Sequence, residues 1–286
     1  MRANIDARSK AFYLLYPLLL AALFPIVQLL TSIVLSLLTG SAFGEETAHE
    51  ITATAEYLLA VTSISQLLAL AVIMWHSRAI RRQPAAASRR LLDRRTIRSA
   101  VLVSGPVIVL TVGAQIVEGS ILSLFNVPLG RYAEIAELIL QAHIAIVIVT
   151  VAIIPGICEE IIFRGIIQPV TVRGSGPVSG IVYTAAMFGI VHLVPVQIFA
   201  GFFFGIVFGY VCYRAGSVLP AIISHIAANA IVALVGRVGS DSGTSTEVLA
   251  GDAASTGMLL TALGIGALVA AAGVVWFEKT VREGRW

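Results

Sequence analysis

Long apolar runs recur along most of the chain, and only short polar connections separate them. A helix needs about 20 apolar residues to cross the hydrocarbon core of a bilayer. The pattern therefore predicts an all-α, polytopic membrane protein with about eight transmembrane helices. The predicted spans are 12–38, 51–75, 99–125, 134–169, 178–194, 196–214, 217–237 and 257–278.

Composition supports this interpretation, because 58% of the 286 residues are hydrophobic and only 12% are charged. Soluble globular chains carry about 25% charged residues. The first apolar run is too long for the core of a signal peptide and has no small-residue cleavage site behind it, so we expect it to remain as a span. No internal repeat is evident, and we interpret residues 1–286 as a single membrane domain with N-terminal transmembrane helices over 1–125.

Basic residues gather in some connections and acidic residues in the others. The most basic connection follows the second span and contains Arg78, Arg81, Arg82, Arg89, Arg90, Arg94, Arg95 and Arg98. Positively charged loops stay on the cytoplasmic side, so we predict an integral protein of the cell membrane with both termini cytoplasmic. A solvated topology determinant is favoured here over a docking patch for anionic lipid. The segment 238–256, rich in Ser, Gly, Thr and Ala, is predicted to be an exterior loop.

Two adjacent acids and an arginine lie inside the fourth predicted span. A charged side chain at the bilayer centre costs about 2.5–3.5 kcal/mol on insertion scales, so such residues are usually functional. Glu160 and Arg164 are four residues apart on one helix face, which favours a structural ion pair. Glu159 lies about 100° further round the helix and stays available for chemistry. Pro155 predicts a kink just before the acids.

Further polar residues lie in the later spans. His192 ends the fifth, and His225 and Asn229 share one face of the seventh. The two cysteines, Cys158 and Cys212, lie in apolar runs and are expected to be buried rather than bridged. The sixth span carries a glycine at every fourth position, a pattern that lets membrane helices pack closely; these glycines are Gly201, Gly205 and Gly209.

Buried polar groups need partners, so we expect Glu159, His192, His225 and Asn229 to converge. Such a set can activate a water molecule, with Glu159 as the general base and a histidine and Asn229 as oxyanion donors. Alternatively, Glu159, His192 and His225 can ligate a divalent metal such as zinc, although the usual HExxH motif is missing. The residues leave both chemistries open.

The three motifs resemble those of a known family when taken in order. Glu159-Glu160-x-x-x-Arg164, Phe188-x-x-x-His192 and His225-x-x-x-Asn229 are similar to the motifs of the CPBP (Abi) family of CAAX proteases and bacteriocin-processing enzymes, which includes the type II CAAX prenyl endopeptidase. The resemblance covers about residues 130–235 and implies an intramembrane endopeptidase.

The resemblance also implies residue roles. Glu159 and His192 would activate water, while His225 and Asn229 would form an oxyanion site or complete a metal site. It implies a membrane-associated peptide or protein substrate, with lipidated substrates included, and no nucleic acid partner. Two other functions remain open: a proton-coupled transporter, and a non-catalytic membrane scaffold or immunity factor.

Overall fold

The computed structural model describes residues 7–81, 94–241 and 255–283. The centre of the arginine-rich connection and most of the predicted 238–256 loop lie outside these ranges. Every regular element within them is helical, in agreement with the predicted all-α class. The elements towards the two ends of the chain, which carry none of the four predicted site residues, are α1 (Ala7–Phe43), α2 (Glu45–Thr52), α3 (Ala55–Arg81), α5 (Arg94–Leu124), α6 (Arg131–Gln141) and α14 (Thr256–Arg282).

One long composite helix occupies the centre of the molecule. It consists of α7 (Ile144–Val147), η1 (Ile148–Ile153), α8 (Ile154–Glu160), η2 (Ile161–Ile167) and α9 (Gln168–Ser175), where η1 and η2 are π-helical. The helices that follow are α10 (Pro177–Ile190), α11 (Pro195–Ala215) and α12 (Leu219–Asp241).

Seven helices in the described part of the chain are long and apolar enough to cross a membrane, and α10 is a shorter apolar helix. The prediction of a polytopic membrane protein is confirmed, with α10 in place of the eighth full span. The predicted start of the fourth span is wrong. Ala142 is extended, His143 caps a new helix by accepting from the backbone of Ala145, and Arg237 donates to the Ala142 carbonyl.

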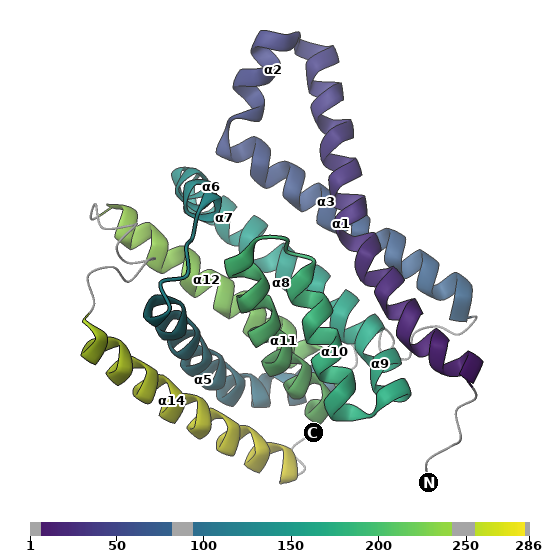
Figure 1. The fold of residues 1–286 in the computed structure, drawn as a ribbon, viewed down its shortest axis with the longest axis vertical. Coiled ribbons are helices and arrows are strands. Elements are labelled where there is room, and N and C mark those ends of the chain that lie inside the picture. The colour runs from purple at the N-terminus through teal and green to yellow at the C-terminus, as the bar shows by residue number, and fades with distance from the viewer. Residues whose placement is uncertain (1–6, 82–93, 242–254, 284–286) are drawn as a thin grey trace.

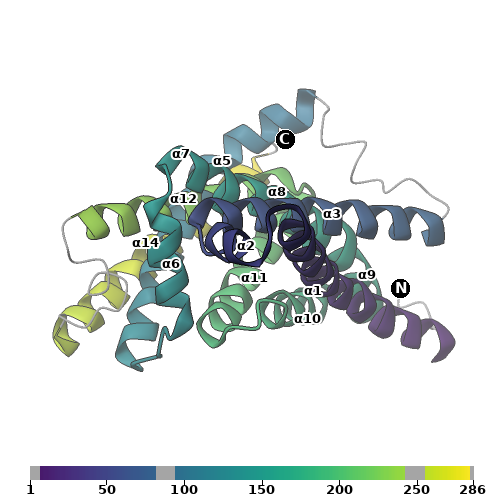
Figure 2. The same cartoon turned by 90° about the horizontal axis from the view of Figure 1, so that it is seen from above.

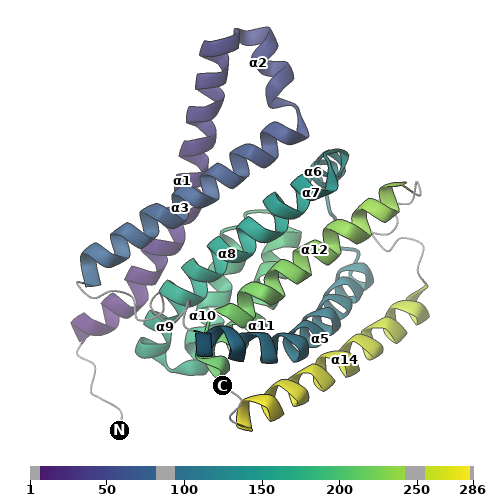
Figure 3. The ribbon, with the colours of Figure 1, turned by 180° about the vertical axis from the view of Figure 1, so that it is seen from behind.

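The composite helix lies between α3 and α12 (Figure 1). Seen from behind, α3, α8, α12, α5 and α14 follow one another across the molecule (Figure 3). Helices α10 and α11 lie on one side of this layer (Figure 2) and contact its central members. The arrangement brings helices from both halves of the chain against α8, which carries the two adjacent acids.

Pro155 coincides with a change in helical winding. The π-helical segment η1 ends at Ile153, and α8 begins with Pro155 in its first turn. Proline cannot donate a hydrogen bond, so it leaves the carbonyl four residues earlier, that of Val151, without its α-helical donor. The amide of Asn229 on α12 donates to this carbonyl at 3.0 Å. A backbone irregularity in the membrane is thus satisfied by a neighbouring helix.

Small residues allow two pairs of helices to approach closely. On α11, a Cβ added at Gly205 would come within 2.8 Å of Ala185 on α10, and one added at Gly209 within 2.9 Å of Ile181. The predicted glycine ridge therefore packs against α10. A second set, which the sequence analysis missed, joins α5 to α14 through Gly113, Gly266 and Gly273.

The α5–α14 contact predicts unequal effects of two alanine substitutions on the same helix. A Cβ at Gly273 would overlap the backbone of Leu110 on α5, whereas Gly264 faces open space. Overpacking of this kind costs about 1–3 kcal/mol. We expect Gly273→Ala to lower the midpoint of thermal unfolding in detergent and Gly264→Ala to leave it unchanged. Equal midpoints for the two variants would contradict the close packing of α14 on α5.

Candidate active site

Glu159 and Glu160 lie on α8 and are both buried, with exposed fractions of 5% and 0%. The Glu160 carboxylate accepts a hydrogen bond of 2.8 Å from Nη1 of Arg164. This is the ion pair that the i, i+4 spacing predicts. The guanidinium of Arg164 also lies 4.3 Å from the ring centroid of Phe188 and contacts the carbonyl of Gly205. The charges of Glu160 and Arg164 therefore compensate each other within the protein, as buried charges in a membrane require.

His225 on α12 contacts the same carboxylate. Its Nδ1 lies 2.9 Å from Oε1 of Glu160, and a carboxylate can only accept, so the hydrogen is assigned to Nδ1. The ring stacks on Phe208 with centroids 5.2 Å apart. Glu160 thus orients His225 in addition to binding Arg164. The sequence analysis missed this contact, because spacing along one helix does not reveal which residues face each other on two helices.

The other ring nitrogen of His225 faces Glu159, with 3.9 Å between Nε2 and Oε2. In the neutral form of a ring with the hydrogen on Nδ1, Nε2 is an acceptor, and so are the oxygens of a carboxylate such as Glu159. At this distance the two atoms do not form a direct hydrogen bond. Oε2 of Glu159 and Nε2 of His225 can therefore both accept hydrogen bonds from one molecule placed between them. A water molecule, with its two O–H groups, can donate to both.

Gln66 on α3 supplies a further partner that the sequence analysis missed. Its Nε2 donates to Oε1 of Glu159 at 3.1 Å. The sequence feature that could have indicated this contact is a glutamine inside an apolar span, close to Ser63 and Ser65. The two oxygens of Glu159 therefore have different surroundings, with Gln66 at one and His225 at the other.

His192 follows the end of α10, and its Nδ1 lies 2.7 Å from the carbonyl of Phe188. The Phe188 ring meets both histidines edge to face, with centroids 5.0 Å from His192 and 6.1 Å from His225. Within the described ranges, no hydrogen bond or ion pair joins His192 to Glu159. The structure therefore brings His225 directly to Glu159 and places His192 beyond Phe188.

Asn229 is the fourth predicted member of the site. Its amide donates to the Val151 carbonyl, so this donor is used to hold α12 against η1. At the preceding residue, Gln115 of α5 donates to the carbonyl of Ala228. Two side-chain amides therefore fix this part of α12, which carries His225.

A polar seam continues from the site along the composite helix. Gln168 is buried and donates to the carbonyl of Gly209 at 2.9 Å, one turn along α11 from the Gly205 carbonyl that Arg164 contacts. Thr171 lies close to Thr184 of α10, with 2.8 Å between the hydroxyls. The glycines of α11 thus leave their backbone carbonyls within reach of side chains on the composite helix, in addition to forming a flat packing surface.

The predicted metal site requires Glu159, His192 and His225 to surround one point. Among the residues that the structure describes, no three His, Cys, Asp or Glu side chains are grouped as metal ligands. The contacts at Nδ1 of His225 and of His192 leave the other nitrogen of each ring available to a metal, but only His225 lies near Glu159. Because His192 is not grouped with these two residues, the arrangement does not fit a zinc site made of Glu159, His192 and His225. Cys158 and Cys212 are free and buried.

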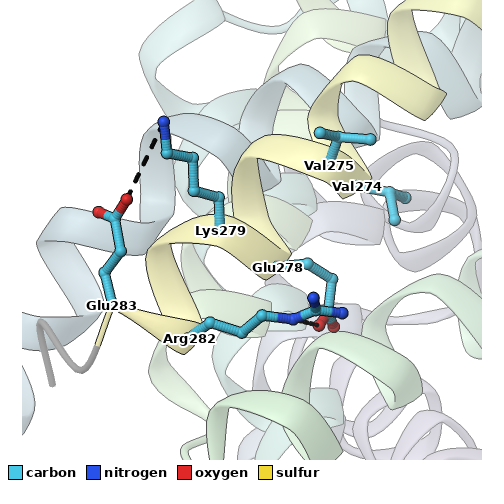
Figure 4. A pocket seen from close by; sticks show the side chains of 6 residues that line it. All are labelled: Val274, Val275, Glu278, Lys279, Arg282 and Glu283. Carbon is cyan, nitrogen blue, oxygen red and sulfur yellow. Dashed lines mark ion pairs between the residues drawn. The ribbon is translucent and has the colours of Figure 1, made fainter.

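A surface groove lies at the end of α14 (Figure 4) and is lined by residues of that helix and the residue after it: Val274, Val275, Glu278, Lys279, Arg282 and Glu283. None of them belongs to the predicted site. The charges in the groove pair with one another, Lys279 with Glu283 and Arg282 with Glu278. Glu278 also binds Arg214 and Tyr210 of α11. The groove is therefore interpreted as a helix-end ion-pair cluster.

Comparison with known proteins gives one match. Residues 141–231 match the family model described as Rce1-like, type II CAAX prenyl endopeptidase Rce1-like. The match includes η1, α8, η2, α10, α11 and the part of α12 with His225 and Asn229, whereas Gln66 lies outside it. No curated protein and no solved structure matches the chain. Over residues 141–231 this match agrees with the family resemblance of the three motifs.

The buried network predicts a large loss of stability when one acid is neutralised. Glu160→Gln leaves the Arg164 guanidinium buried without its counter-charge, which costs about 3–5 kcal/mol in buried pairs. We expect a strongly lowered unfolding midpoint in detergent. Lys279→Met removes an exposed ion pair and should change the free energy of unfolding by less than about 1 kcal/mol. If Glu160→Gln unfolded at the wild-type temperature, the network would not be essential to the fold.

The donor geometry predicts that zinc is not an intrinsic component. We expect substoichiometric zinc in the purified protein by elemental mass spectrometry, with the same content in wild type and His225→Ala. Stoichiometric zinc that disappears in His225→Ala would contradict the prediction and restore the metal site proposed from the sequence.

Proposed function

We propose that this chain, which belongs over residues 141–231 to the Rce1-like family of type II CAAX prenyl endopeptidases, is an intramembrane endopeptidase that uses Glu159 and His225 to activate water. The observation that carries the proposal is the pair of acceptors, Oε2 of Glu159 and Nε2 of His225, facing each other at 3.9 Å. The family match favours this function over the transporter and the non-catalytic scaffold.

In the proposed reaction, a water molecule donates to both acceptors. Glu159 removes a proton as the water oxygen attacks the carbonyl carbon of the scissile peptide bond. The C–O bond forms, and the former carbonyl oxygen carries the negative charge. When the tetrahedral intermediate collapses, the C–N bond breaks and Glu159 returns the proton to the leaving nitrogen. One water molecule is consumed, and a carboxylic acid and an amine are produced.

Glu160 supports this reaction through His225. A carboxylate that accepts from one ring nitrogen fixes the orientation and tautomer of the imidazole and leaves the other nitrogen free to act, as in the Ser-His-Asp triad. We assign this role to Glu160, with Arg164 holding its carboxylate in turn. The proposal therefore extends the structural role predicted for Glu160 to orientation of the catalytic histidine.

The distances also favour roles for the two histidines and Asn229 that differ from those implied by the resemblance. His225, rather than His192, is the histidine beside Glu159. We assign to Asn229 the positioning of α12 through the Val151 carbonyl. His192 lies against the same Phe188 ring as His225, and we propose that it contacts the substrate rather than the attacking water.

We propose a membrane-associated peptide or protein as substrate, including peptides with a prenylated cysteine. Glu159 lies on a helix apolar enough to cross the membrane, with α3 and α12 as neighbours that are also long and apolar enough to do so. A substrate anchored by a lipid chain reaches such a site from the bilayer. A prenyl group also concentrates the substrate in the membrane, since each buried methylene contributes about 0.8 kcal/mol.

The proposal predicts the kinetics of substitutions at the site. A positioned general base contributes about 10²–10⁴-fold to the rate. We expect Glu159→Gln and His225→Ala to lower kcat by at least about 100-fold, with unfolding midpoints that show a folded protein. The assay uses purified protein in liposomes and an internally quenched CAAX peptide with a prenylated cysteine. The matched control is Glu137→Gln, which neutralises an exposed acid on α6.

The same assay without the prenyl group tests the substrate class. If only the prenylated peptide is cleaved, the lipid is recognised; if both are cleaved, the peptide alone suffices. Full activity of Glu159→Gln, or no cleavage of either peptide by wild type, would overturn the proposed reaction.

A further inference from the structure

We propose that Gln66 of α3 is a positioning residue that holds the Glu159 carboxylate in its reactive orientation. The inference rests on the proposed function and assigns a role to a residue outside the segment 141–231 that the family model covers. On this proposal, the active site is assembled from the N-terminal helices as well as from the composite helix and α12.

The first support is that the two carboxylate oxygens of Glu159 have different neighbours. Oε1 accepts from Nε2 of Gln66 at 3.1 Å, while Oε2 faces Nε2 of His225. A carboxylate with neither oxygen hydrogen-bonded rotates readily about its terminal torsion, which has a broad energy profile. The Gln66 contact restricts that rotation and keeps Oε2 directed at His225.

The second support is the unpartnered end of the Gln66 amide. The side chain is 6% exposed, and its Oε1 has no hydrogen-bond partner within the described residues. Turning the amide over would place Oε1 against the Glu159 carboxylate, an arrangement of two acceptors, so the assignment of Nε2 to Glu159 is chemically determined. A buried carbonyl without a partner reduces stability. The favourable contribution of this amide at its position is therefore its hydrogen bond to Glu159.

Gln168 provides a matched control within the same fold. It is also a buried glutamine, its Nε2 donates one hydrogen bond, and its Oε1 has no partner in the described part of the chain. Its acceptor, however, is the backbone carbonyl of Gly209 rather than a predicted catalytic group. Gln66→Met and Gln168→Met therefore each remove one hydrogen bond of a buried glutamine amide, and only the first of these bonds involves Glu159.

The test compares the two methionine variants in liposomes with the prenylated, internally quenched peptide. A displacement of about 1 Å at a catalytic group can reduce a rate by about 100-fold. We expect Gln66→Met to lower kcat by about 10- to 100-fold with KM within about 2-fold of wild type, and Gln168→Met to change kcat by less than about 3-fold. The unfolding midpoints of the two variants should be similar. Gln66→Asn keeps the amide on a shorter side chain, so it should also lower kcat, and it replaces the methionine variant if that protein does not fold.

A double-mutant cycle of Gln66 and Glu159 distinguishes positioning of the Glu159 carboxylate from a general structural effect. Glu159→Asp keeps a carboxylate but withdraws it from Gln66. In the Glu159→Asp background, Gln66→Met should change kcat by less than about 3-fold, because effects of residues that act as one unit are not additive. A purely structural glutamine would reduce kcat by the same factor in both backgrounds.

The outcomes distinguish this inference from the proposed function. If wild type cleaves the peptide, Glu159→Gln does not, and Gln66→Met keeps the wild-type kcat, the role of Gln66 is refuted and the proposed function stands. Equal losses for Gln66→Met and Gln168→Met, or additive losses in the Glu159→Asp background, also refute it. If wild type is inactive or Glu159→Gln is fully active, the proposed function itself fails, and the role of Gln66 fails with it.

Discussion

The structure depends on one buried network, in which the Glu160 carboxylate binds Arg164 and His225 at the same time. Charges in a bilayer are tolerated only when protein groups replace the water that they lose. Arg164 obtains this replacement from Glu160, from the Phe188 ring and from a carbonyl on α11. The network therefore fixes the composite helix against α10, α11 and α12 together. Because His225 is part of it, the same interactions that make the buried charges tolerable also orient the proposed catalytic ring.

The irregular backbone around these charges follows from the same requirement. Pro155 and the π-helical segments change the winding of the composite helix immediately before and after the acids. Such π segments are frequent at functional sites. The Val151 carbonyl, which proline cannot serve, is bound by Asn229. The carbonyl that lacks its helical donor, which would be costly in lipid, thus holds α12 through a hydrogen bond. The residue that donates this bond, Asn229, lies one helical turn from His225.

Sequence alone predicted the fold class, the family and the Glu160–Arg164 pair, because each depends on hydropathy or on spacing within one helix. It did not predict that His225 binds Glu160 or that Gln66 reaches Glu159, since those contacts depend on how separate helices face one another. The expected convergence of four side chains is also only partly present. Glu159 and His225 meet, whereas His192 contacts Phe188 and Asn229 contacts Val151. Residue type identified the polar groups, but helix packing determined their partners.

The two acids are adjacent in sequence, yet their surroundings differ, and the proposed reaction gives them different roles. Glu160 is bound by a cation and an imidazole N–H, so its charge is compensated before any substrate arrives. Glu159 is bound by the neutral amide of Gln66 and faces an acceptor, so its charge is not compensated by the protein. A carboxylate of the second kind gains most from a donor placed between it and His225, and water is the donor that hydrolysis requires. The proposed division into a structural and a reactive acid therefore rests on their partners on α3, η2 and α12, and not on the Glu-Glu pair itself.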